Sequence, residues 1–193
     1  MIPKIIHYCW FGGKPMPELA LKCIESWKKY LPDYELRLWN EDTFDVNSVP
    51  YVKEAYEARK FAFVTDYVRL WAMEREGGVY MDTDVEVVKS LDPFLQHRAF
   101  AGFERIDRVQ TGLLACEKDF PLFREFMAYY DTASFLREDG TPDVTTNVEI
   151  LTGLCLQRGM VCNDRLQEIE GLTLYPREVF CPVDYDTKRL KKT

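Results

Sequence analysis

The stretch Gly77-Gly78-Val79-Tyr80-Met81-Asp82-Thr83-Asp84 carries the strongest structural signal in this 193-residue sequence. Its two glycines end a helical pattern, and the short apolar run after them is typical of a buried strand. Asp82 and Asp84 stand one residue apart, so in extended backbone both carboxylates project to the same side. Two such oxygen ligands suit a hard divalent cation. The stretch therefore predicts a helix, a strand and an acidic cation site at the end of that strand.

The Asp-x-Asp pattern is weak evidence by itself, because Asp184-Tyr185-Asp186 repeats it near the C-terminus. The pair Asp82 and Asp84 is favoured because it follows an apolar strand that begins at a glycine pair, where a ligand can approach the strand end. The alternative for this pair is a solvated turn between two strands.

The helical pattern before the glycines covers 61–76 and, with a break near Arg59, an earlier segment over 52–58. Asp66 and Arg69 lie three residues apart on a face that is otherwise apolar. They form either an ion pair at the edge of the core or the wall of a ligand cleft. In the cleft, Asp66 accepts hydroxyl groups and Arg69 lies near phosphate.

The N-terminal segment has the pattern of a strand, a helix and a second strand, over 5–11, 17–31 and 34–39. Trp10 comes directly before Gly12-Gly13, where an indole can stack on a nucleotide base while glycines allow close backbone approach. The alternative is a tryptophan of the core, because the whole run is apolar.

The rest of the chain continues the alternation of strands and helices. We expect strands over 79–81, 85–88, 99–103 and 111–115, and helices over 121–130 and 147–158. The pattern predicts an α/β fold with a central mixed, mostly parallel sheet flanked by helices. In such folds ligands bind at the carboxyl ends of the strands, where Trp10 to Gly13 and Asp82 to Asp84 both fall.

Composition limits the class of protein. An apolar fraction of 47% and a net charge of −7 indicate a soluble globular domain without broad affinity for nucleic acid. The six cysteines include no Cys-x-x-Cys pair, and no signal peptide or membrane span is recognisable. We therefore expect a cytoplasmic protein. Peripheral contact with the inner face of a membrane stays open. The C-terminal basic residues form either a solvated tail or such a phosphate or membrane contact: Lys188, Arg189, Lys191 and Lys192.

No nucleophilic triad or phosphate-binding loop is present in the sequence. His7 is interpreted as a strand residue and His97 as a surface residue.

Three strings together resemble a known family: residues 2–13, the segment Phe61 to Leu70, and the stretch from Gly77 to Asp84. In order and spacing they are similar to the retaining glycosyltransferases with a short Asp-x-Asp sugar-binding region. This GT-A-fold family, of the family 32 type, includes capsular-polysaccharide and lipooligosaccharide transferases and yeast mannosyltransferases. The glucosylating domains of clostridial toxins are distant relatives.

The resemblance implies a role for each matching residue. Donor binding falls to Trp10, stacked on the base, with Cys9, Phe11, Tyr80, Asp82 and the more loosely matched Gln110 and Thr111. The transferred sugar is held by Asp66 and Arg69, and a manganese or magnesium ion by Asp82 and Asp84. The implied partners are a nucleotide-sugar donor and a carbohydrate or lipid-linked glycan acceptor.

Relatives continue past a segment like 174–180 to a histidine closely followed by Ser-Trp, which this sequence lacks. We therefore expect 1–193 to be a single GT-A-type domain without that C-terminal segment. Two other classes stay open: a sugar-nucleotide phosphohydrolase or nucleotidyltransferase, and a catalytically impaired carbohydrate-binding relative.

Overall fold

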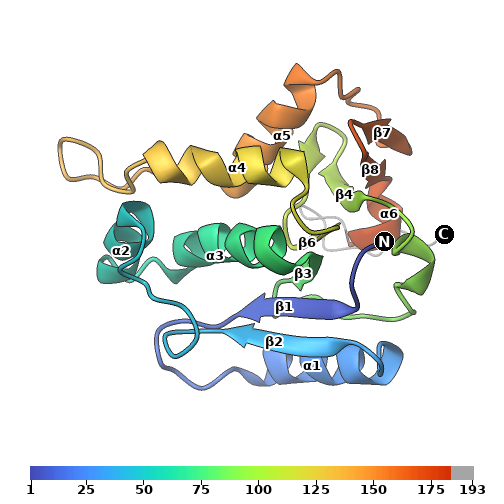
Figure 1. Cartoon of the computed structure of the whole chain (residues 1–193), viewed down its shortest axis with the longest axis horizontal. Coiled ribbons are helices and arrows are strands. Elements are labelled where there is room, and N and C mark those ends of the chain that lie inside the picture. The colour runs from blue at the N-terminus through green and yellow to red at the C-terminus, as the bar shows by residue number, and fades with distance from the viewer. Residues whose placement is uncertain (184–193) are drawn as a thin grey trace.

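The computed structural model describes residues 1–183 (Figure 1). The strands are β1 (Ile5–Cys9), β2 (Glu35–Trp39), β3 (Gly78–Met81), β4 (Ala99–Arg105), β5 (Arg108–Val109), β6 (Leu113–Cys116), β7 (Gln167–Ile169) and β8 (Leu172–Tyr175). The helices are α1 (Glu18–Tyr30), α2 (Pro50–Glu57), α3 (Phe61–Glu76), α4 (Pro121–Thr132), α5 (Asn147–Gln157), α6 (Arg177–Phe180) and the 3₁₀ turn η1 (Asp92–Phe94). The second Asp-x-Asp motif and the basic C-terminal residues, both within 184–193, lie outside the described residues.

The strands form one mixed sheet in the order β2-β1-β3-β6-β4-β8-β7, with β5 beside β4. Pairing is parallel for β1–β2, β1–β3 and β4–β8, and antiparallel for β3–β6, β4–β6, β4–β5 and β7–β8. As a result β1, β2, β3, β4 and β8 all run in one direction, and β5, β6 and β7 run against them. The predicted α/β class with a mixed, mostly parallel sheet is confirmed.

Side chains alternate between two apolar clusters, one on each face of the sheet. In β3, Tyr80 belongs to the cluster formed with α2, α3, α4 and α5, whereas Val79 and Met81 belong to the cluster formed with α1. Figure 1 shows α1 on one side of β1 and β2, with α3 and α4 on the other side. The sheet is therefore the middle of three layers.

The connection from α3 into β3 needs glycine. Gly78 has a φ of 110°, and a Cβ there would lie 2.7 Å from the carbonyl oxygen of Ile5. Only glycine combines this backbone conformation with so close an approach to β1. Because β1 and β3 are parallel neighbours, the chain leaves both strands at one edge, with Trp10 after β1 and Asp82 after β3.

Most predicted elements are confirmed, including the break between α2 and α3 at Arg59. The strand predicted over 85–88 is wrong, because its backbone groups bond to side chains of α1 instead of to another strand. Trp27 Nε1 donates to Val85 O at 2.7 Å, and Val87 N donates to Ser26 Oγ at 2.9 Å. The predicted strand 111–115 begins later, at Leu113.

Both histidines have structural contacts. His7 is fully buried in β1, where Nε2 lies 2.8 Å from Gly77 O and Nδ1 accepts from Trp39 Nε1 at 3.1 Å. His97 is half-buried and lies 2.7 Å from the Tyr175 hydroxyl. Among residues 1–183, no helix is both long and apolar enough to cross a membrane.

Candidate active site

A pocket of about 810 Å³ opens at the carboxyl ends of β1 and β3. Its wall combines the end of β1, the start of α3, the turn after β3 and the start of α5. The lining residues are Cys9, Trp10, Phe11, Gly12, Lys14, Arg59, Phe61, Ala62, Phe63, Thr65, Asp66, Arg69, Tyr80, Asp82, Thr83, Asp84, Thr111, Thr146 and Asn147. Nine of the ten residues predicted to bind donor, sugar or metal thus come together, and Gln110 does not line this pocket.

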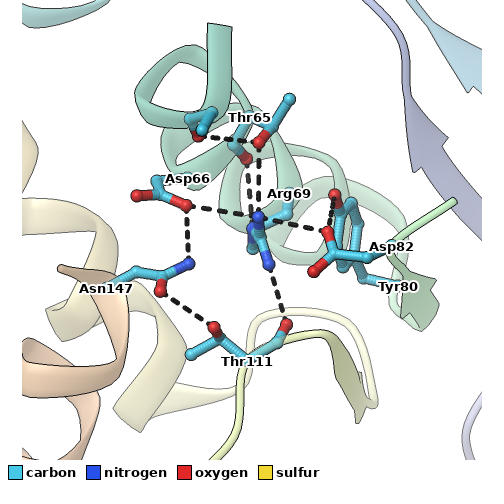
Figure 2. A network of polar contacts seen from close by, with 8 residues as sticks. Thr65, Asp66, Arg69, Tyr80, Asp82, Thr111 and Asn147 are labelled. Carbon is cyan, nitrogen blue, oxygen red and sulfur yellow. Dashed lines mark hydrogen bonds and ion pairs between the residues drawn. The ribbon is translucent and has the colours of Figure 1, made fainter. Parts of the chain in front are cut away.

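Arg69 is the centre of the polar wall and is only 4% exposed. Figure 2 shows its guanidinium between two carboxylates, with Nη2 at 3.2 Å from Asp66 Oδ1 and 3.3 Å from Asp82 Oδ1. Its Nη1 donates to Thr111 O at 2.8 Å, and Nε donates to Thr65 O at 3.2 Å. Every nitrogen of the guanidinium is engaged, so Arg69 is a fixed positive charge that orients its neighbours.

Asp66 is held from a second direction by the first residue of α5. Asn147 Nδ2 donates to Asp66 Oδ1 at 2.6 Å, and Asn147 Oδ1 accepts from Thr111 Oγ1 at 2.8 Å (Figure 2). Within residues 1–183, Asp66 Oδ2 has no hydrogen-bond partner. One carboxylate oxygen is therefore fixed by the protein while the other is available to a ligand.

The charges of this network are set by burial and by neighbours. Burial raises the pKa of Asp66 to about 6, against the lowering effect of Arg69. Burial disfavours the charged form of Arg69 as well, but Asp82, Tyr80 and Asp66 outweigh it and raise the pKa of the guanidinium. Arg69 therefore stays protonated, whereas Asp66 ionises near neutral pH.

The turn after β3 presents the two acidic residues differently. Asp82 Oδ1 accepts from the Tyr80 hydroxyl at 2.8 Å and pairs with Arg69, whose guanidinium lies 4.4 Å from the Tyr80 ring centroid. Asp84 is exposed, and its side chain has no hydrogen bond to any residue of 1–183. The turn is closed by Val85 N, which donates to Asp82 O at 3.0 Å.

These two carboxylates fit a divalent cation that is completed by a substrate. Asp82 Oδ2 and both oxygens of Asp84 are without hydrogen-bond partners in the described part of the chain. Residues 1–183 contain no group of three or more histidine, cysteine, aspartate or glutamate side chains that could hold a metal by themselves. Magnesium in particular commonly binds through one or two carboxylates together with substrate phosphates, and this donor set matches that arrangement.

The loop after β1 forms the opposite wall. Trp10 is half-buried and belongs to neither apolar cluster, so the alternative of a core tryptophan does not hold. Its indole Nε1 donates to Lys14 O at 2.6 Å. Gly12, with a φ of 95°, packs so tightly on Phe61 that a Cβ would lie 2.5 Å from that ring.

The remaining predicted donor contacts are buried. Cys9 and Phe11 lie in the wall with 5% and 6% exposure, and burial raises the pKa of the Cys9 thiol to about 12, so it is not a nucleophile. Gln110 lies near Gly112, where an added Cβ would be 3.9 Å from Gln110 Oε1 and 3.1 Å from Asp82 Oδ2. The Gln110 Nε2 has no hydrogen-bond partner within residues 1–183. Its role in donor binding stays a prediction.

Sequence reasoning missed Asn147, the polar start of α5. The available signal was the capping box that precedes it, in which Thr146 Oγ1 accepts from Glu149 N and the Glu149 carboxylate accepts from Thr146 N. That signal places a helix start at Asn147 but does not say what the helix start faces.

Part of the chain matches the model of a known protein family. Residues 17–101 match the family described as "Glycosyltransferase sugar-binding region containing DXD motif". The resemblance found in the sequence is thereby confirmed, since residues 17–101 are similar to the sugar-binding region of the DXD glycosyltransferases.

The chain is also similar to several curated proteins. The chain is 28% identical over 124 residues to inositol phosphoceramide mannosyltransferase 3 of Schizosaccharomyces pombe, covering 62% of this chain and 35% of the relative. It is 27% identical over 157 residues to an uncharacterised glycosyltransferase of Acanthamoeba polyphaga mimivirus, covering 76% and 61%. A mannosyl phosphorylinositol ceramide synthase of Saccharomyces cerevisiae is 30% identical over 52% of this chain and 27% of that protein. The chain thus spans less than two thirds of these relatives.

Solved structures confirm the predicted GT-A-like fold. The glycosyltransferase PaToxG superposes with a TM-score of 0.59 at 18% identity, covering 81% of this chain and 68% of that chain. An active-site mutant of LgtC superposes with a TM-score of 0.50 at 16% identity, covering 90% and 73%. At these identities the likeness concerns the fold alone.

Proposed function

We propose that this protein is a metal-dependent glycosyltransferase that moves a sugar from a nucleotide-diphosphate-sugar donor to a glycan or polysaccharide-precursor acceptor. The observation that carries the proposal is that Trp10, the Asp66–Arg69 pair and the Asp82–Asp84 turn, far apart in sequence, share one pocket. A pocket of about 810 Å³ is within the usual size for a ligand of this kind.

The donor's sugar lies against Asp66. Its Oδ2 accepts sugar hydroxyls, while Asn147 and Arg69 hold Oδ1 and fix the orientation of the carboxylate. A carboxylate with one oxygen fixed and one available positions a sugar with little loss of entropy on binding. Arg69 supplies fixed positive potential to the wall and needs no rearrangement during the reaction.

The donor's diphosphate lies at the turn after β3, with Asp82 and Asp84 as protein ligands of a manganese or magnesium ion. When bound, this ion neutralises the charge that develops on the leaving diphosphate. The base stacks on Trp10, whose indole is held by Lys14 O at 2.6 Å.

Transfer proceeds with retention of anomeric configuration. The acceptor hydroxyl attacks the anomeric carbon from the side of the leaving group, the bond from that carbon to the diphosphate oxygen breaks, and the hydroxyl proton passes to that oxygen. This course needs no enzyme nucleophile. Cys9, the only thiol that residues 1–183 contribute to the pocket wall, stays protonated because burial raises its pKa to about 12.

Mannose is the first donor sugar to test, because mannosyl transfer is named for two of the relatives. We place the activity in the cytoplasm, where a lipid-linked acceptor would be met at the inner face of the membrane.

Product analysis tests the proposal against its two alternatives. The protein is incubated with a panel of nucleotide sugars, with manganese or with EDTA, and the products are separated. A glycosyltransferase releases nucleoside diphosphate only with manganese. Nucleoside monophosphate with sugar phosphate would instead identify a phosphohydrolase, and binding of the donor without any cleavage would identify a carbohydrate-binding relative.

A further inference from the structure

Two cationic side chains of the pocket wall have no acidic partner among the residues that the structure describes. Lys14 and Arg59 are exposed and line the pocket, and within residues 1–183 neither side chain forms a hydrogen bond or an ion pair. The third cation of the wall, Arg69, is by contrast paired with two carboxylates. In a chain of net charge −7, unpaired cations inside a pocket attract an anionic ligand.

The backbone at Arg59 strengthens this reading. Its φ of 58° is in the left-handed region, and Lys60 N donates to Ala55 O at 2.8 Å, the bond that closes a Schellman motif after a helix. Glycine or asparagine occupies this position at little cost, whereas arginine is strained there. Within residues 1–183 the Arg59 side chain forms no hydrogen bond or ion pair that would compensate for the strain, which points to a role toward a ligand.

Both cations border the part of the pocket next to Trp10. The Lys14 carbonyl oxygen accepts a hydrogen bond from the Trp10 indole N–H, and Lys14 also lines an adjoining hollow of about 520 Å³ with Tyr56 and the acidic residues Glu41 and Asp42. Glu41 Oε1 accepts from Gly12 N at 2.6 Å and from the Tyr56 hydroxyl at 3.0 Å instead of pairing with Lys14. Arg59 N donates to Tyr56 O at 2.9 Å. Neither Asp82 nor Asp84 lines the adjoining hollow.

We propose that Lys14 and Arg59 form a phosphate-binding subsite that acts independently of the cation at Asp82 and Asp84. Ammonium and guanidinium groups both donate charge-assisted hydrogen bonds to phosphate oxygens. The inference rests on the proposed function, under which the nucleoside diphosphate stacked on Trp10 supplies the phosphate. A lipid diphosphate on the acceptor has the same chemistry, and the test separates the two sources.

The test is calorimetry in EDTA, where the acidic pair holds no metal. Five ligands are titrated into wild type, Lys14→Gln, Arg59→Asn and the double variant. They are uridine diphosphate, guanosine diphosphate, the two corresponding nucleosides without phosphate, and a short prenyl diphosphate. We expect the double variant to bind the nucleoside diphosphate about tenfold more weakly and the nucleoside unchanged. Lys118→Gln is the matched control, since Lys118 is exposed, makes no side-chain ion pair within 1–183 and lies outside both pockets.

The calorimetric outcomes decide whether the subsite exists and which diphosphate it binds. A loss confined to the prenyl diphosphate supports the subsite and assigns it to the acceptor. Equal affinities of wild type and double variant for every diphosphate, or no diphosphate binding by wild type in EDTA, overturn it. These failures differ from failure of the proposed function, which is read from manganese-dependent donor cleavage by the wild type.

Thermal melts guard against a structural explanation for Arg59. Asparagine adopts the left-handed conformation more readily than arginine, so Arg59→Asn should melt at an unchanged or higher temperature while binding diphosphate more weakly. A lower melting temperature would show that Arg59 supports the fold and would remove it from the subsite.

Discussion

Replacing Asp82 and Asp84 separately by asparagine distinguishes the cation-binding role of each carboxylate from its role in the fold. Asp82 is one of two anions facing Arg69, a guanidinium that is 4% exposed. Asp82→Asn keeps an oxygen for the Tyr80 hydroxyl but removes that charge. Because the Asp82 side chain is 36% exposed, we expect a cost of only about 1–2 kcal/mol, below the value for a fully buried pair.

Asp84 has no such partner among the described residues. It is exposed and makes no side-chain hydrogen bond within residues 1–183, so Asp84→Asn should change the free energy of unfolding by less than about 0.5 kcal/mol. Loss of a like charge beside Asp82 acts in the stabilising direction. For a domain of this size about 1 kcal/mol corresponds to roughly 2–4 °C. Asp82→Asn should therefore melt about 2–8 °C lower than wild type, and Asp84→Asn at nearly the same temperature.

Melts with and without manganese and a nucleoside diphosphate measure both roles. Wild type should gain stability from the pair of ligands, and both variants should lose that gain, because ligand-induced stabilisation follows affinity. Asp131→Asn, an exposed carboxylate outside the pocket, controls for net charge and should keep the gain. The reasoning is refuted if Asp84→Asn is destabilised without metal yet still shows the full ligand-induced shift.

Three further predictions concern the rest of the wall and the core beneath it. Trp10→Ala should weaken nucleotide binding by about 1–3 kcal/mol in calorimetry with little loss of stability, since Trp10 lies outside both apolar clusters; unchanged affinity with an intact fold would contradict stacking. Asn147→Ala removes a donor at 2.6 Å from the buried Asp66 carboxylate, so it should lower the free energy of unfolding by about 2–4 kcal/mol and move the pKa of Asp66 above about 6. Urea unfolding measures the first effect and an NMR titration the second. A lowered pKa of Asp66 would contradict the arrangement. Burial lowers the pKa of His7 to about 4, so between pH 6.5 and 4 the unfolded chain binds a proton that the folded chain does not. His7 should therefore reduce the free energy of unfolding by up to about 3 kcal/mol as pH falls through this range. The raised pKa of Asp66 has the opposite effect on stability in this range, so the contribution of His7 is measured by comparing wild type with His7→Gln. The difference in stability between the two proteins should shrink on acidification. A constant difference would argue against a neutral buried imidazole.

The fold was predictable where the sequence pattern is strong and local. Periodicity and the glycine pair placed β1, α1, β2, α2, α3 and β3, because each of these segments has its own apolar pattern and stop signal. The segment 85–88 has the composition of a strand but bonds to Trp27 and Ser26 of α1. Whether a backbone group meets another strand or a distant side chain is decided by tertiary packing, which a local pattern does not contain.

The residues of the candidate site also fall into those that a local sequence pattern reveals and those that only tertiary packing reveals. Trp10, Asp66, Arg69, Asp82 and Asp84 were found because each stands at a motif or interrupts an apolar face. Asn147 was not found, since it is 81 residues from the carboxylate it binds and the sequence around it indicates only a helix start. The absence of ion pairs from Lys14 and Arg59 to residues 1–183 likewise depends on which carboxylates lie nearby in space.

Calorimetric titration of a nucleoside diphosphate into the wild-type protein, once with saturating manganese and once with EDTA, tests the central claim most directly. The claim is that the Asp82–Asp84 turn and the Trp10 loop bind one donor nucleotide together through a cation. It predicts one nucleotide per chain, bound at least about tenfold more tightly with manganese than with EDTA. Equal affinity in the two titrations would contradict it.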